Sequence, residues 1–171
     1  MVKTYYLEIN IKLLAEMISN LLEQAHELCE LGEFDQAIFV YDRILRKEHD
    51  NVSALIDKGL TLQRLEQNNN SLDCLKKALS IQPKNIDALV SIGATLHAMR
   101  EFNTAIDYYN KALKIDENLP IALAYKGLAM GELGEITGAL QCFKDALSID
   151  RDYDIALAGK DTATKILKSK N

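Results

Sequence analysis

The chain has no tryptophan and only two prolines, eight glycines and three cysteines among its 171 residues. So few prolines and glycines disfavour an all-β protein, since such a fold needs many turns. No run of about 18 apolar residues is present, which argues against a membrane-spanning helix. Cys29, Cys74 and Cys142 have no short paired spacing, so we expect reduced and mostly buried thiols.

Positive charge is also scarce. Lys and Arg total 20 against 25 Asp and Glu, which gives a formal net charge of −5. Nucleic-acid binders and membrane-surface proteins rely on clustered Lys and Arg, so we expect neither a nucleic-acid partner nor membrane insertion. Glu8, Lys12 and Glu16 interrupt the apolar residues near the start, which disfavours a signal peptide and predicts a cytoplasmic protein.

What the sequence does have is a period of 34 residues. Two columns of small residues and two columns of leucine recur at that spacing: Ala37, Ser71, Ala105, Ala139; Ala25, Gly59, Gly93, Gly127; Leu21, Leu55, Leu89, Leu123; and Leu45, Leu79, Leu113, Leu147. A fixed period of this size is typical of stacked repeats. Because glycine inside a helix costs about 0.5–1 kcal/mol relative to alanine, we expect the glycine column to mark a close helix contact.

Each repeat is predicted to hold two helices joined by a turn near its fifteenth position. Gly32 and Gly134 lie in Leu-Gly-Glu turns, where glycine can adopt the left-handed conformation that ends a helix. The third repeat has Arg100 in this place. In the second repeat, Asn68 stands where the first and third have phenylalanine, and asparagine here is expected to cap the following helix.

These columns resemble the tetratricopeptide repeat (TPR) family, and the resemblance covers residues 18–153. Pro83 occupies the proline position of that family, whereas the other repeats deviate there. The resemblance implies an all-α fold, a right-handed superhelical solenoid of antiparallel helix pairs. The implied organisation is an N-terminal extension at 1–17, repeats at 18–51, 52–85, 86–119 and 120–153, and a C-terminal capping helix at 154–171.

Residues 1–17 allow two interpretations. Leu7, Ile9 and Ile11 alternate with other residues as in a strand, whereas Leu13, Leu14 and the residues after them follow a helical spacing. The segment is either an extension of the first helix or an apolar arm that docks into a groove of its own chain or of a neighbouring copy.

The resemblance also implies a partner-binding surface, because the first helix of each repeat lines a concave groove in this family. The groove residues carried over to this sequence are Leu22, Glu23, His26, Ile56, Asp57, Leu60, Gln63, Arg64, Val90, Ser91, Ala94, His97, Ala124, Tyr125 and Leu128. The family's carboxylate clamp uses Lys, Asn and Arg at positions that are apolar or His here. An apolar groove with acidic edges instead suits a peptide or amphipathic helix that carries Lys or Arg.

Two readings of this surface stay open. The first is a non-enzymatic scaffold or adaptor that binds a partner protein in the groove, and the second is a self-assembling structural protein whose residues 1–17 dock into a neighbouring copy. Leu22, Ile56 and Val90 could also pack between adjacent first helices without binding anything.

No pattern indicates a catalytic residue, a metal site or a cofactor. His26 and Cys29 are three residues apart on one helix, but zinc needs three or four ligands and no further Cys or His stands near them in sequence. Glycine-rich phosphate loops are absent, because the glycines follow the repeat.

The turn of the second repeat should be the least stable point inside the array. Asn68 replaces an aromatic side chain whose burial contributes about 1.5–3 kcal/mol. We therefore expect amide hydrogens around Asn68 to exchange faster than those around Phe102 in a hydrogen-exchange measurement. Slower exchange at the second-repeat turn would contradict this expectation.

Overall fold

The computed structural model describes the backbone of residues 2–169 and the side chains of residues 10–169. Within this part of the chain every regular element is an α-helix and no strand is present. The helices are α1 (Val2–Glu30), α2 (Phe34–Lys47), α3 (Val52–Arg64), α4 (Asn68–Ile81), α5 (Ile86–Ala98), α6 (Phe102–Leu113), α7 (Pro120–Glu132), α8 (Ile136–Ile149) and α9 (Asp154–Ser169).

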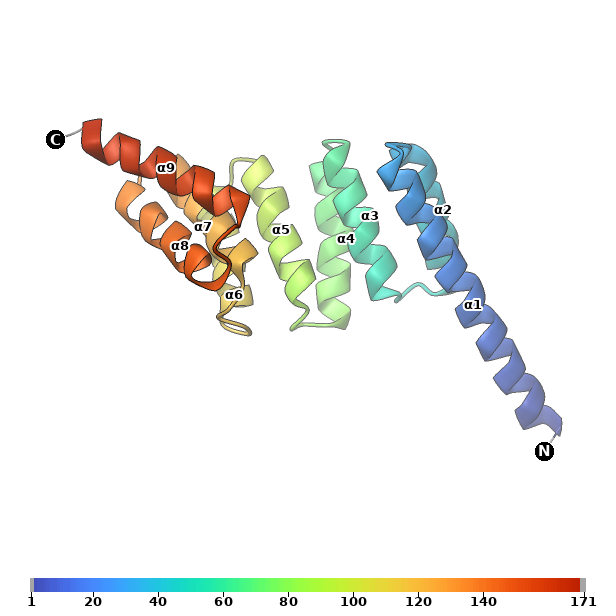
Figure 1. Cartoon of the computed structure of the whole chain (residues 1–171). Coiled ribbons are helices and arrows are strands. Elements are labelled where there is room, and N and C mark those ends of the chain that lie inside the picture. The colour runs from blue at the N-terminus through green and yellow to red at the C-terminus, as the bar shows by residue number, and fades with distance from the viewer. Residues whose placement is uncertain (1, 170–171) are drawn as a thin grey trace. The chain divides into compact units, whose positions relative to one another are not determined.

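The helices form two compact units, residues 1–81 with α1–α4 and residues 82–171 with α5–α9. In each unit, helices that follow one another in sequence pack side by side (Figure 1). The first unit has a core of buried apolar residues from α1, α2 and the start of α3, and the second has one from α7, α8 and α9. The all-α fold predicted from the repeat is confirmed.

The turn inside each of the four helix pairs has the same backbone conformation. Gly32 and Gly134 have φ of +77° and +81°, and the non-glycine residues Glu66 and Arg100 at the equivalent positions have φ of +59° and +62°. In all four turns the amide that follows this residue donates to a carbonyl of the preceding helix, at N–O distances of 2.8–2.9 Å. The turn thus survives without glycine, although a left-handed non-glycine residue costs roughly 1–2 kcal/mol.

The predicted cap at Asn68 is wrong. Helix α4 begins at Asn68 itself, and the Asn68 side-chain oxygen is buried without a hydrogen-bond partner. Asparagine caps other helices instead: Asn51 accepts from the Ala54 amide at 2.9 Å, and Asn85 accepts from the Ala88 amide at 2.8 Å. An N-cap is the residue just before the first residue of a helix. Because α4 already begins at Asn68, this residue cannot serve as its cap.

The glycine column lies where the two helices of a pair approach most closely. A Cβ atom added to Gly93 would lie 2.5 Å from the Tyr109 ring, and one added to Gly127 would lie 2.8 Å from the Phe143 ring. Tyr109 and Phe143 are fully or almost fully buried. The absence of a side chain at these positions therefore lets a large ring of the second helix reach the backbone of the first.

Replacing glycine by alanine should have opposite effects at two positions of the second unit. Gly93→Ala forces its methyl group into the buried Tyr109 ring, so we expect the free energy of unfolding to fall by about 1–3 kcal/mol. Gly131→Ala is the matched control on α7, because nothing lies within 4 Å of its added Cβ. Its stability should stay unchanged or rise by up to about 1 kcal/mol. Chemical unfolding followed by circular dichroism measures both, and equal effects would refute the close-contact explanation.

Candidate functional site

In the first unit the candidate site lies on α1 and α3, the first helices of their pairs. Leu60 is exposed, with 37% of its surface accessible, whereas Ile56 is buried and Leu22 packs against the core. Gln63 is half-buried and Arg64 is exposed. A partner could therefore contact Leu60 and the polar residues of this surface.

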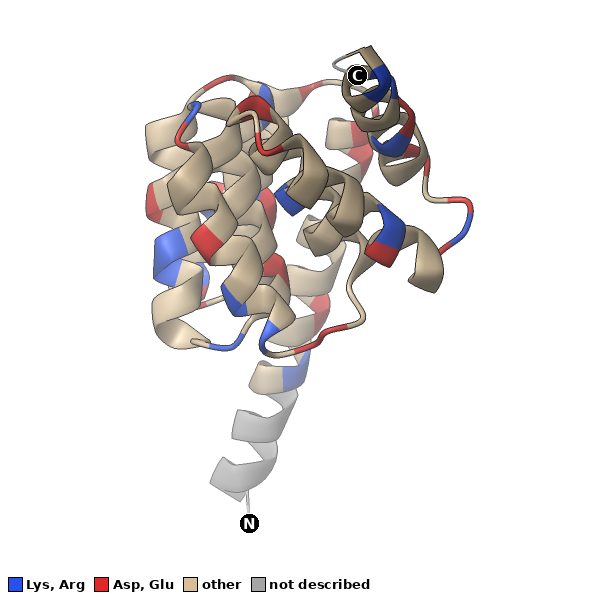
Figure 2. Cartoon of the chain, turned by 90° about the vertical axis from the view of Figure 1, so that its left-hand side faces the viewer, with Lys and Arg blue, Asp and Glu red and all other residues tan. Residues whose placement is uncertain are grey.

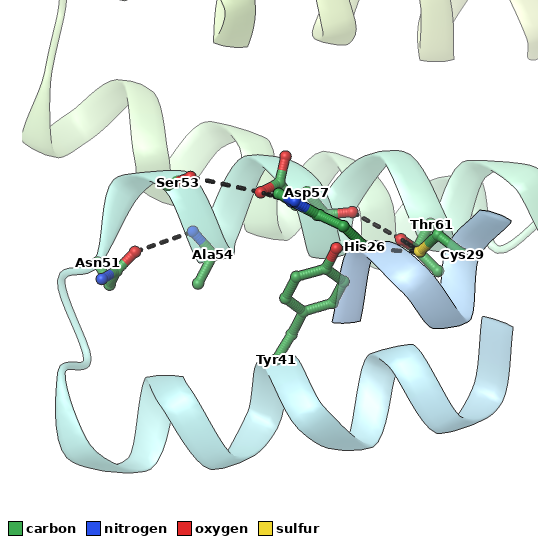
Figure 3. Close-up of polar contacts among 8 residues, drawn as sticks. All are labelled: His26, Cys29, Tyr41, Asn51, Ser53, Ala54, Asp57 and Thr61. Carbon is green, nitrogen blue, oxygen red and sulfur yellow. Dashed lines mark hydrogen bonds and ion pairs between the residues drawn. The ribbon is translucent and has the colours of Figure 1, made fainter. Parts of the chain in front are cut away.

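A polar bridge joins α1 to α3. His26 Nε2 lies 3.1 Å from Asp57 Oδ2, and Ser53 Oγ donates to the same oxygen at 3.3 Å (Figure 3). The bridge is partly open to solvent, since the His26 side chain is 55% exposed and that of Asp57 25%. These contacts hold one carboxylate in a fixed place on the surface.

A second polar cluster lies next to this bridge and is less exposed. The Cys29 thiol is 3.4 Å from Thr61 Oγ1 and 3.9 Å from the Tyr41 hydroxyl (Figure 3). Burial raises the pKa of Tyr41 well above its usual range, so its phenol stays neutral. His26 and Cys29 thus have separate partners, and no group of three or more potential metal ligands occurs among the described residues.

In the second unit several candidate residues pack inside the fold. Val90, Ser91 and Ala124 are buried, whereas Ala94 and Leu128 are half-buried. Ile56 in the first unit and Val90 here are both buried, which agrees with the alternative that they pack inside the fold. These buried residues offer a partner little surface.

Aromatic rings of α5 and α7 pack against rings of α6. The His97 ring packs edge-on against Phe102 at a centroid distance of 5.2 Å, and Tyr125 stacks on Tyr109 at 6.1 Å. The His97 Nε2 and the Tyr109 hydroxyl are buried without hydrogen-bond partners. Burial lowers the pKa of His97, while the nearby Glu132 carboxylate opposes that shift, and burial raises the pKa of Tyr109.

A pocket that the repeat pattern does not predict lies between α7, α8 and α9. Its volume is about 570 Å³, and most of its lining side chains are apolar. The sequence does carry a signal for it, because Gly131 and Gly159 both lack a side chain at positions where the preceding repeats have one. Neither glycine belongs to the glycine column, so the repeat pattern drew no attention to them.

The N-terminal part of α1 has exposed apolar residues. Ile11 is 60% exposed, Leu13 57% and Leu14 36%. The backbone of residues 2–17 is the first part of helix α1, and side chains of residues 1–9 lie outside the described part. Docking of this segment into a groove stays a prediction. None of the described helices has the length and apolar character needed to cross a membrane.

Comparison with known proteins gives a family match over the middle of the chain. Sequence profiles of the tetratricopeptide repeat match residues 52–85 and residues 86–119. These are the ranges in which the 34-residue period places the second and third repeats. No curated protein matches the chain significantly in sequence.

Solved structures share the fold at low sequence identity. A thermophilic TPR protein of Thermus thermophilus, TTC0263, has a TM-score of 0.78 and 21% identity, over 86% of this chain and 82% of its own. The MamA protein has a TM-score of 0.71 and 23% identity, over 90% of each chain. YrrB, described as a TPR protein with an unusual peptide-binding site, has a TM-score of 0.67 and 20% identity, over 91% of this chain and 84% of its own. With two repeats matched in sequence and the fold shared with solved TPR proteins, the chain is a tetratricopeptide repeat protein.

Proposed function

We propose that this protein is a non-enzymatic scaffold that binds a peptide or amphipathic helix of a partner protein on the first helices of its repeats. The observation that carries the proposal is the surface of α1 and α3, where exposed Leu60 lies on the same helix as the fixed carboxylate of Asp57. YrrB, a TPR protein of similar fold, has a peptide-binding site. Membership in the family supports protein binding as the general activity.

Charge decides the kind of partner. Glu23 and Glu30 are exposed on α1, and Asp57 on α3 is partly exposed. Arg64 lies with its guanidinium 5.7 Å from the Phe34 ring centroid, so the one fixed cation among the candidate residues already has a neighbour. Residues of both charges are distributed over the helices, with acidic residues in excess over the whole chain (Figure 2). A segment that combines apolar residues with Lys or Arg matches this surface.

The second unit offers a smaller set of accessible candidates. Ala94, Tyr125 and Leu128 are half-buried, and Glu132 is exposed at the end of α7. Each unit thus presents apolar side chains with an acidic residue on the same helices.

Single charge substitutions on the first helices test this proposal. Leu60→Glu and Leu128→Glu each place a carboxylate among the apolar residues, so we expect capture of a given partner from native lysate to fall roughly tenfold. Phe39→Glu is the control, because Phe39 is 60% exposed but lies on α2, the second helix of its pair. Circular dichroism verifies that all three variants fold. Partners retained by both Leu60→Glu and Leu128→Glu would place binding elsewhere.

A second candidate function is self-assembly through residues 1–17. The observation that favours it is the exposure of the apolar residues Ile11, Leu13 and Leu14 on α1. By their spacing, Lys12 and Glu16 lie on the other side of the helix from Ile11 and Leu14, and that side is polar apart from Leu13. A neighbouring copy that covers Ile11 and Leu14 would remove them from water.

Oligomeric state tests the second candidate. Self-assembly predicts a multimer in size-exclusion chromatography with light scattering, and a monomer for the double variant Ile11→Glu/Leu14→Glu. Lys12→Glu changes the net charge by the same two units on the polar side and should assemble like the unmodified chain. A monomer before any substitution would eliminate the self-assembly function while leaving the scaffold function intact.

A further inference from the structure

We propose that the pocket between α7, α8 and α9 binds an aromatic side chain of the partner segment, with an adjacent Lys or Arg of that segment paired to Glu132. The inference rests on the proposed scaffold function and names one anchor site for it. The pocket holds about 570 Å³ and opens beside Leu128, a half-buried residue of the candidate surface. This volume falls within the range of roughly 300–1,000 Å³ typical of ligand pockets.

Two glycines line the pocket at positions where the preceding repeats carry side chains. Gly131 of α7 and Gly159 of α9 both line it, and the residues 34 positions earlier are His97 and Tyr125. In the same unit His97 and Tyr125 each pack against a ring of α6. The equivalent positions of α7 and α9 carry no ring.

The ring contacts of His97 and Tyr125 indicate which kind of side chain fits the pocket. The His97 ring packs against Phe102, and the Tyr125 ring stacks on Tyr109. In the pocket, Ile136 and Phe143 stand 34 residues after Phe102 and Tyr109, and both line it. A planar ring from outside would therefore find the same type of apolar surface that His97 and Tyr125 find inside the chain.

The two glycines are not equivalent. A Cβ atom at Gly159 would run into the Phe143 ring, so a side chain there would disturb the buried core. At Gly131 nothing lies within 4 Å of an added Cβ. A side chain introduced at Gly131 therefore begins without a clash at a position that lines the pocket.

Charge at the pocket favours a basic neighbour for the ring. Glu132 is the one ionisable residue among the described side chains that line the pocket, and it is exposed. Its carboxylate stands at the end of α7, next in sequence to Gly131. An aromatic residue flanked by Lys or Arg would place a cation near this carboxylate while the ring is buried.

The test uses the full chain and a defined probe, the capped hexapeptide Ala-Lys-Phe-Lys-Ala-Ala, titrated against isotope-labelled protein by NMR. We expect the methyl signals of Ile136 and Ile166 to shift, since both residues line the pocket. Gly131→Leu should weaken binding at least tenfold by filling the space. Gly131→Ala adds one methyl group at the same place and should weaken it less.

Charge variants test the second half of the inference. Glu132→Gln should weaken the lysine-containing probe about two- to fivefold, as for an exposed ion pair. Glu135→Gln removes a neighbouring exposed carboxylate that does not line the pocket and should leave binding unchanged. A probe with Ala in place of Phe should not shift the pocket methyls.

Three results would overturn the inference: no shift of the pocket methyls, equal binding of the Phe and Ala probes, or unchanged binding to a folded Gly131→Leu protein. Other results would contradict the scaffold function. If the probe requires an open Gly131 but no partner depends on Leu60 or Leu128, the scaffold proposal falls, and with it the role of the pocket as an anchor site, although the pocket still binds a ring. If Leu60→Glu abolishes partner capture and Gly131→Leu does not, the scaffold function stands and the pocket inference falls.

Discussion

Close approach of paired helices is the constraint on which the rest of this structure depends. A ring from the second helix of a pair reaches the backbone of the first, as Tyr109 does at Gly93 and Phe143 at Gly127. A methyl group on either glycine would run into that ring. Because such contacts recur with the repeat, the period of 34 residues has a direct mechanical reason, and the remaining positions of the first helices are free to vary.

Because these positions are free to vary, the first helices carry different surface side chains although they share one fold. Between α1 and α3 the polar bridge of His26 and Asp57 spans the surface. On α5 and α7 two rings, His97 and Tyr125, pack against rings of α6. Between α7 and α9 a pocket stays open. The same backbone arrangement thus provides a charged, an aromatic and a hollow site, and a binding surface is set by these variable side chains.

Turn chemistry could be predicted only in part. Glycine at 32 and 134 predicts the left-handed turn, but Glu66 and Arg100 adopt the same conformation without any local preference for it. Packing of the two helices in each pair fixes the turn, and the residue at the turn follows. The failed prediction of a cap at Asn68 has the same cause, since helix α4 begins where the pair requires it to begin.

The sequence by itself determined the helical class, the repeat length and the small-residue contacts, because these follow from spacing along the chain. It also placed the candidate surface on the first helices, although it could not separate buried Ile56 and Val90 from exposed Leu60. Only the tertiary structure decided which side chains face solvent and where the pocket opens. Exposure and empty space depend on neighbours that are distant in sequence, as with Gly131 and Gly159, which line one pocket although they lie on different helices.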